Sequence, residues 1–246
     1  KCFTDGSLGA KTAALREPYV GSESTGILVH TLEELKEFLK AANDHDWQIE
    51  THAIGDRGAE IAIQAYEDVV KPESRPVLTH CQVLTKDLVV RMAKHNIIAN
   101  IQPVHLVTDK TWAEMYLGKS RMRYAYAWKS LLKSGVHCAG GSDAPVEACN
   151  PLLGIHAAVN RQDTKGDPVG GWYPKEKLSV WEAVGLWTTG AAYAEWAEKQ
   201  KGILQPGTFA DMVVLDKDPF KVDPKTIKDI RVLATIVGGV AVFHTE

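Results

Sequence analysis

Residues 48–80 decide the fold, and they run QIETHAIGDRGAEIAIQAYEDVVKPESRPVLTH. A short strand-like segment, Gln48–His52, precedes a segment from Gly58 to Val70 whose apolar residues recur at helical spacing. Pro76–His80 is again strand-like and begins with proline, which the first position of a strand tolerates. Strand, helix and strand in this order predict a parallel pair, because parallel strands need a long crossover connection.

The alternation of helices and strands continues on both sides of this stretch. Thr31-Leu-Glu-Glu34 is a capping box, in which Thr31 and Glu34 satisfy backbone donors at a helix start. The spacing of apolar residues predicts further elements, namely helices over 84–95, 124–133 and 179–196 and strands over 97–101 and 136–140. This pattern predicts an α/β protein with a mostly parallel sheet.

The tail after residue 200 follows a different pattern. Gly202–Gly207 is rich in turn residues, and three β-rich segments come after it, at 210–215, 232–237 and 240–244. The last two meet at Gly238-Gly239, a pair typical of a tight hairpin turn. We therefore predict two domains, a main α/β domain over 1–200 and a small β module over 201–246.

Composition is typical of a soluble globular protein and argues against several function classes. The chain has 246 residues, 45% hydrophobic and 24% charged, with a formal net charge of -3. It contains no Lys/Arg cluster that would predict nucleic-acid binding, and no apolar run of about 18 residues that would predict a membrane span. The first residues lack a signal-peptide pattern and the four cysteines are scattered, so we expect reduced thiols and a cytoplasmic protein.

Three polar residues stand where predicted strands end. His52 and His80 are the last residues of their strands, and Asp143 follows the strand over 136–140. In parallel α/β folds the active site lies at these ends, and imidazole and carboxylate are usual ligands of Zn²⁺. Hydrogen-bonded core roles for the histidines and a turn role for Asp143 explain the pattern about as well. Spacing alone leaves the choice between a metal site and ordinary packing open.

Several longer motifs occur in order over nearly the whole chain. They are Asp5-Gly-Ser-Leu-Gly-Ala-Lys-Thr-Ala13, His52-Ala-Ile-Gly-Asp-Arg57, Gln102-Pro-Val-His105, Gly141-Ser-Asp-Ala-Pro-Val146 and Ala210-Asp-Met-Val-Val-Leu-Asp216. Together they resemble the YtcJ-like branch of the amidohydrolase superfamily, which includes N-substituted formamide deformylases. The resemblance implies a (β/α)8 TIM-type barrel of a metal-dependent hydrolase, with strands four to eight present here, and a small β-sandwich segment at the C-terminus.

The resemblance also implies ligands for one or two divalent metal ions, and zinc is the expected metal. His52 matches the metal histidine of strand five, and His80 matches that of strand six. Asp143 matches the strand-eight aspartate that binds metal and accepts a proton. Lys1 stands where many members carry a carboxylated lysine that bridges two metals. The alternative for Lys1 is an ordinary solvated lysine at the chain end.

Two further residues are candidates for binding substrate. His105 follows the predicted strand over 97–101, and the resemblance implies that it contacts the substrate and orients its carbonyl group. Arg161 is a candidate to reach the pocket from the loop after strand eight. Asp5 and Arg57 lie within matched motifs, although a turn acceptor and a helix-start ion pair describe them equally well.

One departure from the family pattern is large. The family's first metal motif, His-x-His after strand one, does not occur in this sequence, and only four or five barrel strands are recognisable where a closed barrel has eight. We therefore expect this chain to be the C-terminal part of a longer protein and its barrel to need the missing N-terminal half. The sequence does not decide whether the protein forms a homo-oligomer.

The expected function is hydrolysis of a small molecule at a non-peptide C–N bond, an amide or a formamide, through metal-activated water. Asp143 and His105 are the expected catalytic residues. Hydrolysis of an ester, a lactone or a cyclic amide at the same site is an alternative. A further alternative, favoured by the missing His-x-His, is a non-catalytic fragment or binding module that retains the scaffold.

Overall fold

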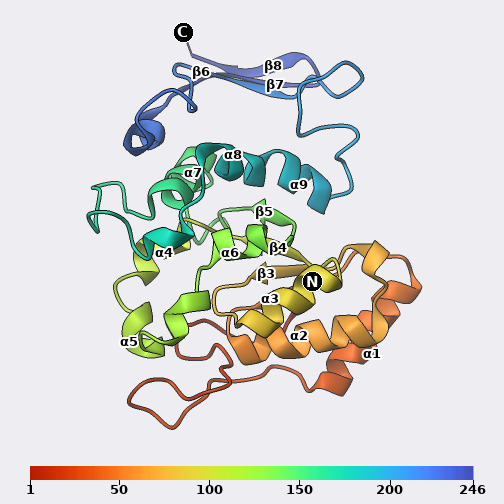
Figure 1. The fold of residues 1–246 in the computed structure, drawn as a ribbon. Coiled ribbons are helices and arrows are strands. Elements are labelled where there is room, and N and C mark those ends of the chain that lie inside the picture. The colour runs from red at the N-terminus through yellow and green to blue at the C-terminus, as the bar shows by residue number, and fades with distance from the viewer. Residues whose placement is uncertain (246) are drawn as a thin grey trace. The chain divides into compact units, whose positions relative to one another are not determined.

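The computed structural model describes residues 1–245 as an α/β protein (Figure 1). In chain order its elements are β1 (Cys2–Phe3), α1 (Leu32–Asp44), β2 (Glu50–Ala53), α2 (Asp56–Val69), η1 (Pro72–Ser74), β3 (Val77–His80), α3 (Lys86–Lys94), β4 (Ile98–Ile101), α4 (His105–Asp109), α5 (Ala113–Leu117), η2 (Arg121–Tyr124), α6 (Trp128–Lys133), β5 (Cys138–Gly140), α7 (Pro151–Asn160), η3 (Pro174–Glu176), α8 (Val180–Trp187), α9 (Thr189–Ala194), β6 (Met212–Leu215), η4 (Pro224–Asp229), β7 (Val232–Val237) and β8 (Val240–His244).

The chain divides into two compact units. The first comprises Lys1–Ile101 and Thr108–Cys138, and the second comprises Gln102–Val107 and the chain from Ala139 onward. Five strands form one sheet in the order β1-β2-β3-β4-β5, and a separate three-stranded sheet has the order β6-β7-β8. The α/β class and the β-rich tail predicted from the sequence are therefore confirmed.

The first unit is built around parallel strands with helices on one face. β1, β2, β3 and β4 pair in parallel, with Phe3 opposite His52, His52 opposite Thr79 and Thr79 opposite Asn100. Helices α1, α2 and α3 lie side by side along this sheet (Figure 1). Because each strand is reached through a helical crossover, the carboxyl ends of neighbouring strands meet at one edge of the sheet.

Helix starts in this unit follow the local sequence. Thr31 caps α1, and its side chain and that of Glu34 form both halves of the predicted capping box. Leu35 and Leu39 lie on one face of α1 and are fully buried. The start of α2 is fixed differently, because the backbone N–H groups of Arg57 and Gly58 donate to the carbonyl of Ala14.

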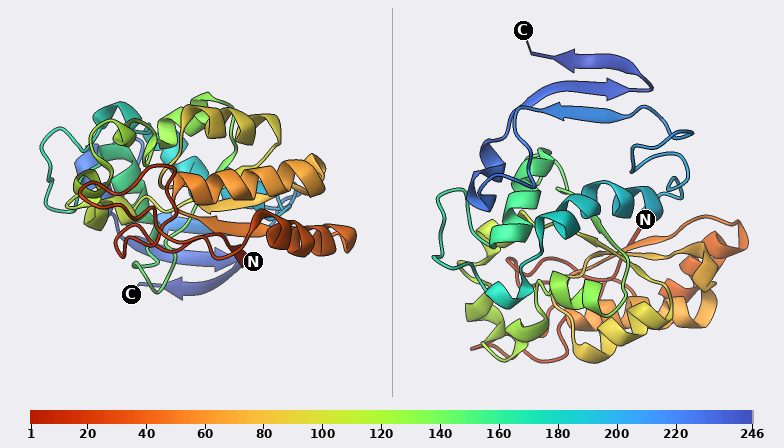
Figure 2. Two further views of the ribbon diagram at one scale, coloured as in Figure 1. Left: turned by 90° about the horizontal axis from the view of Figure 1, so that it is seen from below. Right: turned by 45° about the horizontal axis from the view of Figure 1, so that its top comes forward.

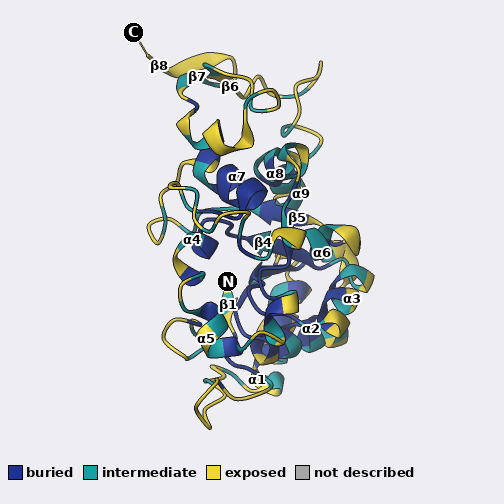
Figure 3. Cartoon of the chain, turned by 60° about the vertical axis from the view of Figure 1, so that its left-hand side comes forward, coloured by how far each residue is buried: buried dark blue, intermediate teal, exposed yellow. Residues whose placement is uncertain are grey.

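The second unit contains helices α7, α8 and α9, the short helix η4 and the antiparallel sheet. α8 begins with the predicted capping box of Ser179 and Glu182, and η4 packs against α7, where the Asn160 side chain donates to the Pro224 carbonyl (2.9 Å). Gly238 and Gly239 both have positive φ and close the predicted β7–β8 hairpin. Figure 2 shows the three strands side by side, and most of their residues are exposed (Figure 3).

Two predicted helices differ from those observed. The helix predicted over 124–133 begins only at Trp128, because residues 124–126 bridge to 82–84 instead and Tyr126 has a left-handed φ of 51°. The helix predicted over 179–196 is broken at Thr188, whose hydroxyl donates to the Val184 carbonyl (3.0 Å). Helices α4, α5 and α7 were not predicted. Within residues 1–245, no helix is long and apolar enough to cross a membrane.

Candidate metal centre

His52 stands near the C-terminal end of β2 and is largely buried. Its Nε2 atom lies 3.0 Å from the Gly6 carbonyl oxygen and 3.4 Å from Oδ1 of Asp5. Both neighbours are acceptors, so Nε2 carries the ring proton and donates it. Nδ1 is thereby left as the ring nitrogen with a lone pair for a metal.

His80 is the last residue of β3, and its backbone is unusual. In the strand register His80 lies opposite Ala53. Because side chains alternate along a strand, Ala53 lies on the other face of the sheet from His52. His80 and the next residue, Cys81, have left-handed φ values of 79° and 51°, which turn the chain where the strand ends. As a result the rings of His52 and His80 meet edge to face, with centroids 4.5 Å apart.

Lys1 immediately precedes β1 and is paired with Glu50, which stands two residues before His52 in β2. Its Nζ atom is 3.8 Å from Oε1 of Glu50 and 5.7 Å from the ring centroid of Phe3. Glu50 also accepts hydrogen bonds from the hydroxyl of Thr79 and the amide of Asn100. The lysine amine therefore belongs to a polar layer on the face of the sheet that carries His52. A bridging, carboxylated Lys1 stays a prediction.

Asp143 and His105 belong to the second unit. Asp143 is half-buried, has a left-handed φ of 57° and accepts a turn hydrogen bond at its carbonyl from the Val146 N–H (2.8 Å). His105 begins α4 and is buried. Burial lowers the pKa of His105 below its ordinary value, and the negative charge of Asp143 opposes that shift. Of the two effects on this pKa, burial is the larger.

Arg161, the predicted substrate contact, ends helix α7 with a left-handed φ of 53° and is fully buried. Its Nε atom donates to the Trp172 carbonyl (2.6 Å), and its guanidinium lies 5.8 Å from the centroid of the Trp172 ring. The Trp172 N–H returns a hydrogen bond to the Arg161 carbonyl. These contacts anchor the loop after α7, and a role of Arg161 in substrate binding stays a prediction.

The expected ligands are distributed over both units. Within the described residues 1–245, no group of three or more His, Cys, Asp or Glu side chains gathers closely enough to hold a metal ion. His52 and His80 form a pair in the first unit, whereas Asp143 lies in the second. The two adjacent imidazoles supply two ligands of a type that Zn²⁺ prefers, whereas a catalytic zinc site takes three protein ligands.

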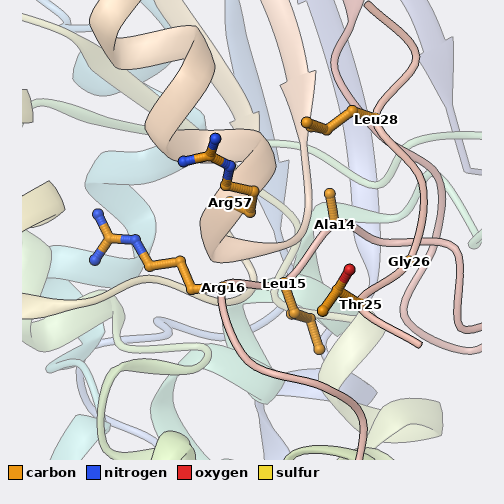
Figure 4. A pocket seen from close by; sticks show the side chains of 7 residues that line it. All are labelled: Ala14, Leu15, Arg16, Thr25, Gly26, Leu28 and Arg57. Atoms are coloured by element: carbon orange, nitrogen blue, oxygen red, sulfur yellow. The ribbon is translucent and has the colours of Figure 1, made fainter. Parts of the chain in front are cut away.

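A pocket of about 390 Å³ offers a competing site in the first unit (Figure 4). It is lined by Ala14, Leu15, Arg16, Thr25, Gly26, Leu28 and Arg57. The two arginines suggest an anion, but Glu60 accepts from both guanidinium groups and Asp87 accepts from that of Arg16. With these carboxylates beside them, the arginines are charge-balanced, and the pocket carries no net attraction for an anion.

Asp5 belongs to a matched motif, and the sequence left its role undecided. Its side chain accepts backbone hydrogen bonds from Ala14, Ile54 and Gly55 and approaches His52. The Asp5-Gly-Ser motif singled it out, but the donors at Ile54 and Gly55 come from the short connection between β2 and α2. Their proximity depends on the β1–β2 register, which the sequence does not specify.

A family model described as the Amidohydrolase family matches residues 1–243. The chain belongs to this family. It is 39% identical over 246 residues to YtcJ of Bacillus subtilis (strain 168), an amidohydrolase by name, with 99% of this chain and 46% of that protein covered. It is 26% identical over 193 residues to N-substituted formamide deformylase of Arthrobacter pascens, covering 77% of this chain and 35% of that protein. The resemblance inferred from the motifs is thereby confirmed.

Solved structures of this fold include relatives of the chain. An uncharacterized metal-dependent hydrolase from Pyrococcus horikoshii OT3 superposes with a TM-score of 0.82 at 30% sequence identity, over 91% of this chain and 45% of that one. This amidohydrolase chain therefore spans about half the length of the relatives it matches.

Proposed function

We propose that the protein containing this amidohydrolase chain is a metal-dependent hydrolase that cleaves a non-peptide C–N bond, an amide or a formamide, in a small molecule. The observation that carries the proposal is the His52–His80 pair at the carboxyl ends of neighbouring parallel strands. Similarity to an N-substituted formamide deformylase supports the C–N bond as the target. We also propose that this protein is located in the cytoplasm.

The proposed fold of the whole protein follows the same reasoning. The strands β1 to β5 are five consecutive parallel strands with helical crossovers, as in strands four to eight of a (β/α)8 barrel. The antiparallel sheet of β6, β7 and β8 is proposed to belong to a small β-sandwich. Exposed valine and phenylalanine side chains on these strands, such as Val242 and Phe243, support a covering layer.

In the proposed site, His52, His80 and Asp143 would hold a divalent metal ion, with zinc the expected one. Such a metal, when bound, polarises a carbonyl group and acidifies water. Asp143 accepts the proton that water loses as the C–O bond forms, and delivers it to the nitrogen as the C–N bond breaks. His105, kept neutral by burial, holds the carbonyl oxygen through a ring N–H.

Metal analysis of the intact protein tests this proposal. We expect one or two equivalents of a divalent metal in the wild type and loss of metal in a His52→Ala/His80→Ala double variant. His45→Ala is the matched control, because His45 is exposed and its ring contacts the Ala41 carbonyl of its own helix. Absence of metal from the reconstituted wild type would favour a non-catalytic binding module.

A substrate panel tests the bond that is cleaved. We expect turnover of formamides or amides and a loss of about 10² to 10⁴-fold in Asp143→Asn with the fold retained, since general acid–base catalysis contributes that much. Turnover of esters or lactones alone would move the assignment to that class at the same residues. Full activity in Asp143→Asn would exclude the proposed proton transfer.

A further inference from the structure

Asp5 is a fully buried carboxylate held by backbone donors from two separate segments. Oδ2 accepts the N–H groups of Ala14 (2.9 Å) and Gly55 (2.7 Å), and Oδ1 accepts that of Ile54 (3.0 Å). Three N–H donors to its two oxygens fix the orientation of the carboxylate. The position of both oxygens is therefore set by the backbone, independently of His52.

The oxygen Oδ1 also faces Nε2 of His52, at 3.4 Å. The same nitrogen lies 3.0 Å from the carbonyl oxygen of Gly6, the residue after Asp5. A lone pair on Nε2 would point at two acceptors, whereas a proton there satisfies both. The stretch of chain after β1 therefore selects the Nε2–H form of His52.

We propose that Asp5 is a positioning residue for a metal site: it holds the ring proton of His52 on Nε2 and so presents the lone pair of Nδ1 to the metal. The inference rests on the proposed function for its metal and on the contacts of Asp5 for its mechanism. Carboxylates commonly orient metal-binding histidines in this way, and they raise the basicity of the ligand nitrogen.

Asp56 provides the matched control within the same region. It is also buried, and its Oδ1 accepts the backbone N–H of Arg16 (2.9 Å), so it ties the same loop to the start of α2. Its carboxylate accepts the backbone N–H groups of Arg16 and Arg57 and faces the positive charge of Arg16. Replacing either aspartate loosens the loop, but only Asp5 acts on the histidine ring.

The first test reads the His52 tautomer from ¹⁵N NMR shifts of the ring nitrogens in the metal-free intact protein, at a pH where the ring is neutral. We expect Nε2–H in the wild type and in Asp56→Asn. In Asp5→Asn the two donors at Ala14 and Gly55 outweigh the single donor at Ile54 and keep the amide oxygen at the Oδ2 position, so the NH₂ group faces His52. A donor there favours the Nδ1–H form, and we expect that form to appear.

The wild-type spectrum alone can overturn the inference, even if Asp5→Asn does not fold: a predominant Nδ1–H form would do so. A pure Nε2–H spectrum in folded Asp5→Asn would also overturn it, because the Gly6 carbonyl alone would then be enough to hold the proton on Nε2. Both outcomes are independent of metal binding, so they are separate from failure of the proposed function.

Metal affinity is the second readout. In competition with a chelator for Zn²⁺, we expect Asp5→Asn to bind about 10 to 100-fold more weakly than the wild type, as for other partners of metal-binding histidines. Asp56→Asn should match the wild type. Equal weakening in both variants would assign Asp5 a purely structural role, and a wild type without zinc binding would instead refute the proposed function.

Discussion

The rings of His52 and His80 are brought together by the left-handed backbone of His80, whose φ is 79°. A residue with a Cβ atom in that region carries strain of about 1 to 3 kcal/mol, and such strain is concentrated at functional sites. Strand alternation alone would direct the two rings to opposite faces of the sheet. The contact therefore depends on a strained residue at the strand end.

Replacing His80 by glycine and by alanine separates strain from ligand chemistry. Both variants remove the imidazole, but only glycine adopts φ near 79° without a Cβ penalty. We expect His80→Gly to have a free energy of unfolding about 1 kcal/mol higher than His80→Ala, measured by urea denaturation. Neither should retain metal. Equal stabilities would show that the backbone of His80 relaxes when the ring is lost.

Gly58, in the first turn of α2, leaves room for the Asp5 carboxylate. A Cβ atom on Gly58 would lie 2.6 Å from Oδ2 and 2.8 Å from Cγ of Asp5. We expect Gly58→Ala to lower the free energy of unfolding by about 1 to 3 kcal/mol through overpacking. Gly185→Ala in α8 is the control, because the nearest atom to its Cβ is 3.7 Å away and alanine is the better helix former. A neutral Gly58→Ala would mean that Asp5 can move.

Tyr66 joins α2 to two strands through a buried hydroxyl. Its oxygen lies 2.7 Å from Oγ1 of Thr51 and 2.8 Å from the Val77 carbonyl oxygen, and burial raises the pKa of the phenol well above its ordinary value. We expect Tyr66→Phe to cost about 1 to 3 kcal/mol of unfolding free energy, because a buried acceptor loses its donor. Tyr116→Phe, at a half-buried tyrosine, should change stability by less than about 0.5 kcal/mol. Similar losses in the two variants would contradict this account.

The Arg16–Asp87 ion pair makes stability depend on acidic pH. The guanidinium of Arg16 donates to both oxygens of Asp87 (3.2 and 2.9 Å), and these hydrogen bonds lower the pKa of Asp87 from 3.8 to about 2. Because the folded-state pKa is lowered, the stabilisation is fully present above pH 3.8 and is lost as pH falls through 2.

Asp87 is half exposed, so solvent screening keeps the pair weak. We expect Asp87→Asn to lower the free energy of unfolding at pH 7 by about 0.5 kcal/mol, with the difference from wild type disappearing near pH 2. Urea denaturation over this pH range measures it. A difference that persists below pH 2 would point to lost hydrogen bonds of the neutral side chain instead.

The sequence predicted those elements that local signals determine. The capping boxes at Thr31 and Ser179, the helix of α2 and the hairpin at Gly238-Gly239 were all identified from residue types and spacing. Each depends on interactions among residues close in the chain. By contrast, the segment around Tyr126 has helical residues but pairs with residues 82–84, a long-range contact that overrides local propensity.

The candidate site was predictable as a set of residue types but not as a geometry. His52 and His80 were identified because both end strands, and a parallel sheet brings neighbouring strand ends together. The role of Asp5 was not predictable, since it depends on donors at Ala14, Ile54 and Gly55 that converge only in the folded sheet. The left-handed conformation of His80 has no signal in its residue type.

The short strand β1 has a consequence for the order in which this protein folds. Pairing of Cys2 with Thr51 closes a loop of about fifty residues. The connections from β2 to β3 and from β3 to β4 are shorter, so these strands pair over smaller sequence separations. We expect β1 to join the sheet last, and amide protection of Thr4, which donates to the His52 carbonyl, to appear after that of β3 during refolding. Until then His52 lacks Asp5, so we expect the affinity for metal to reach its full value only at the final step of folding.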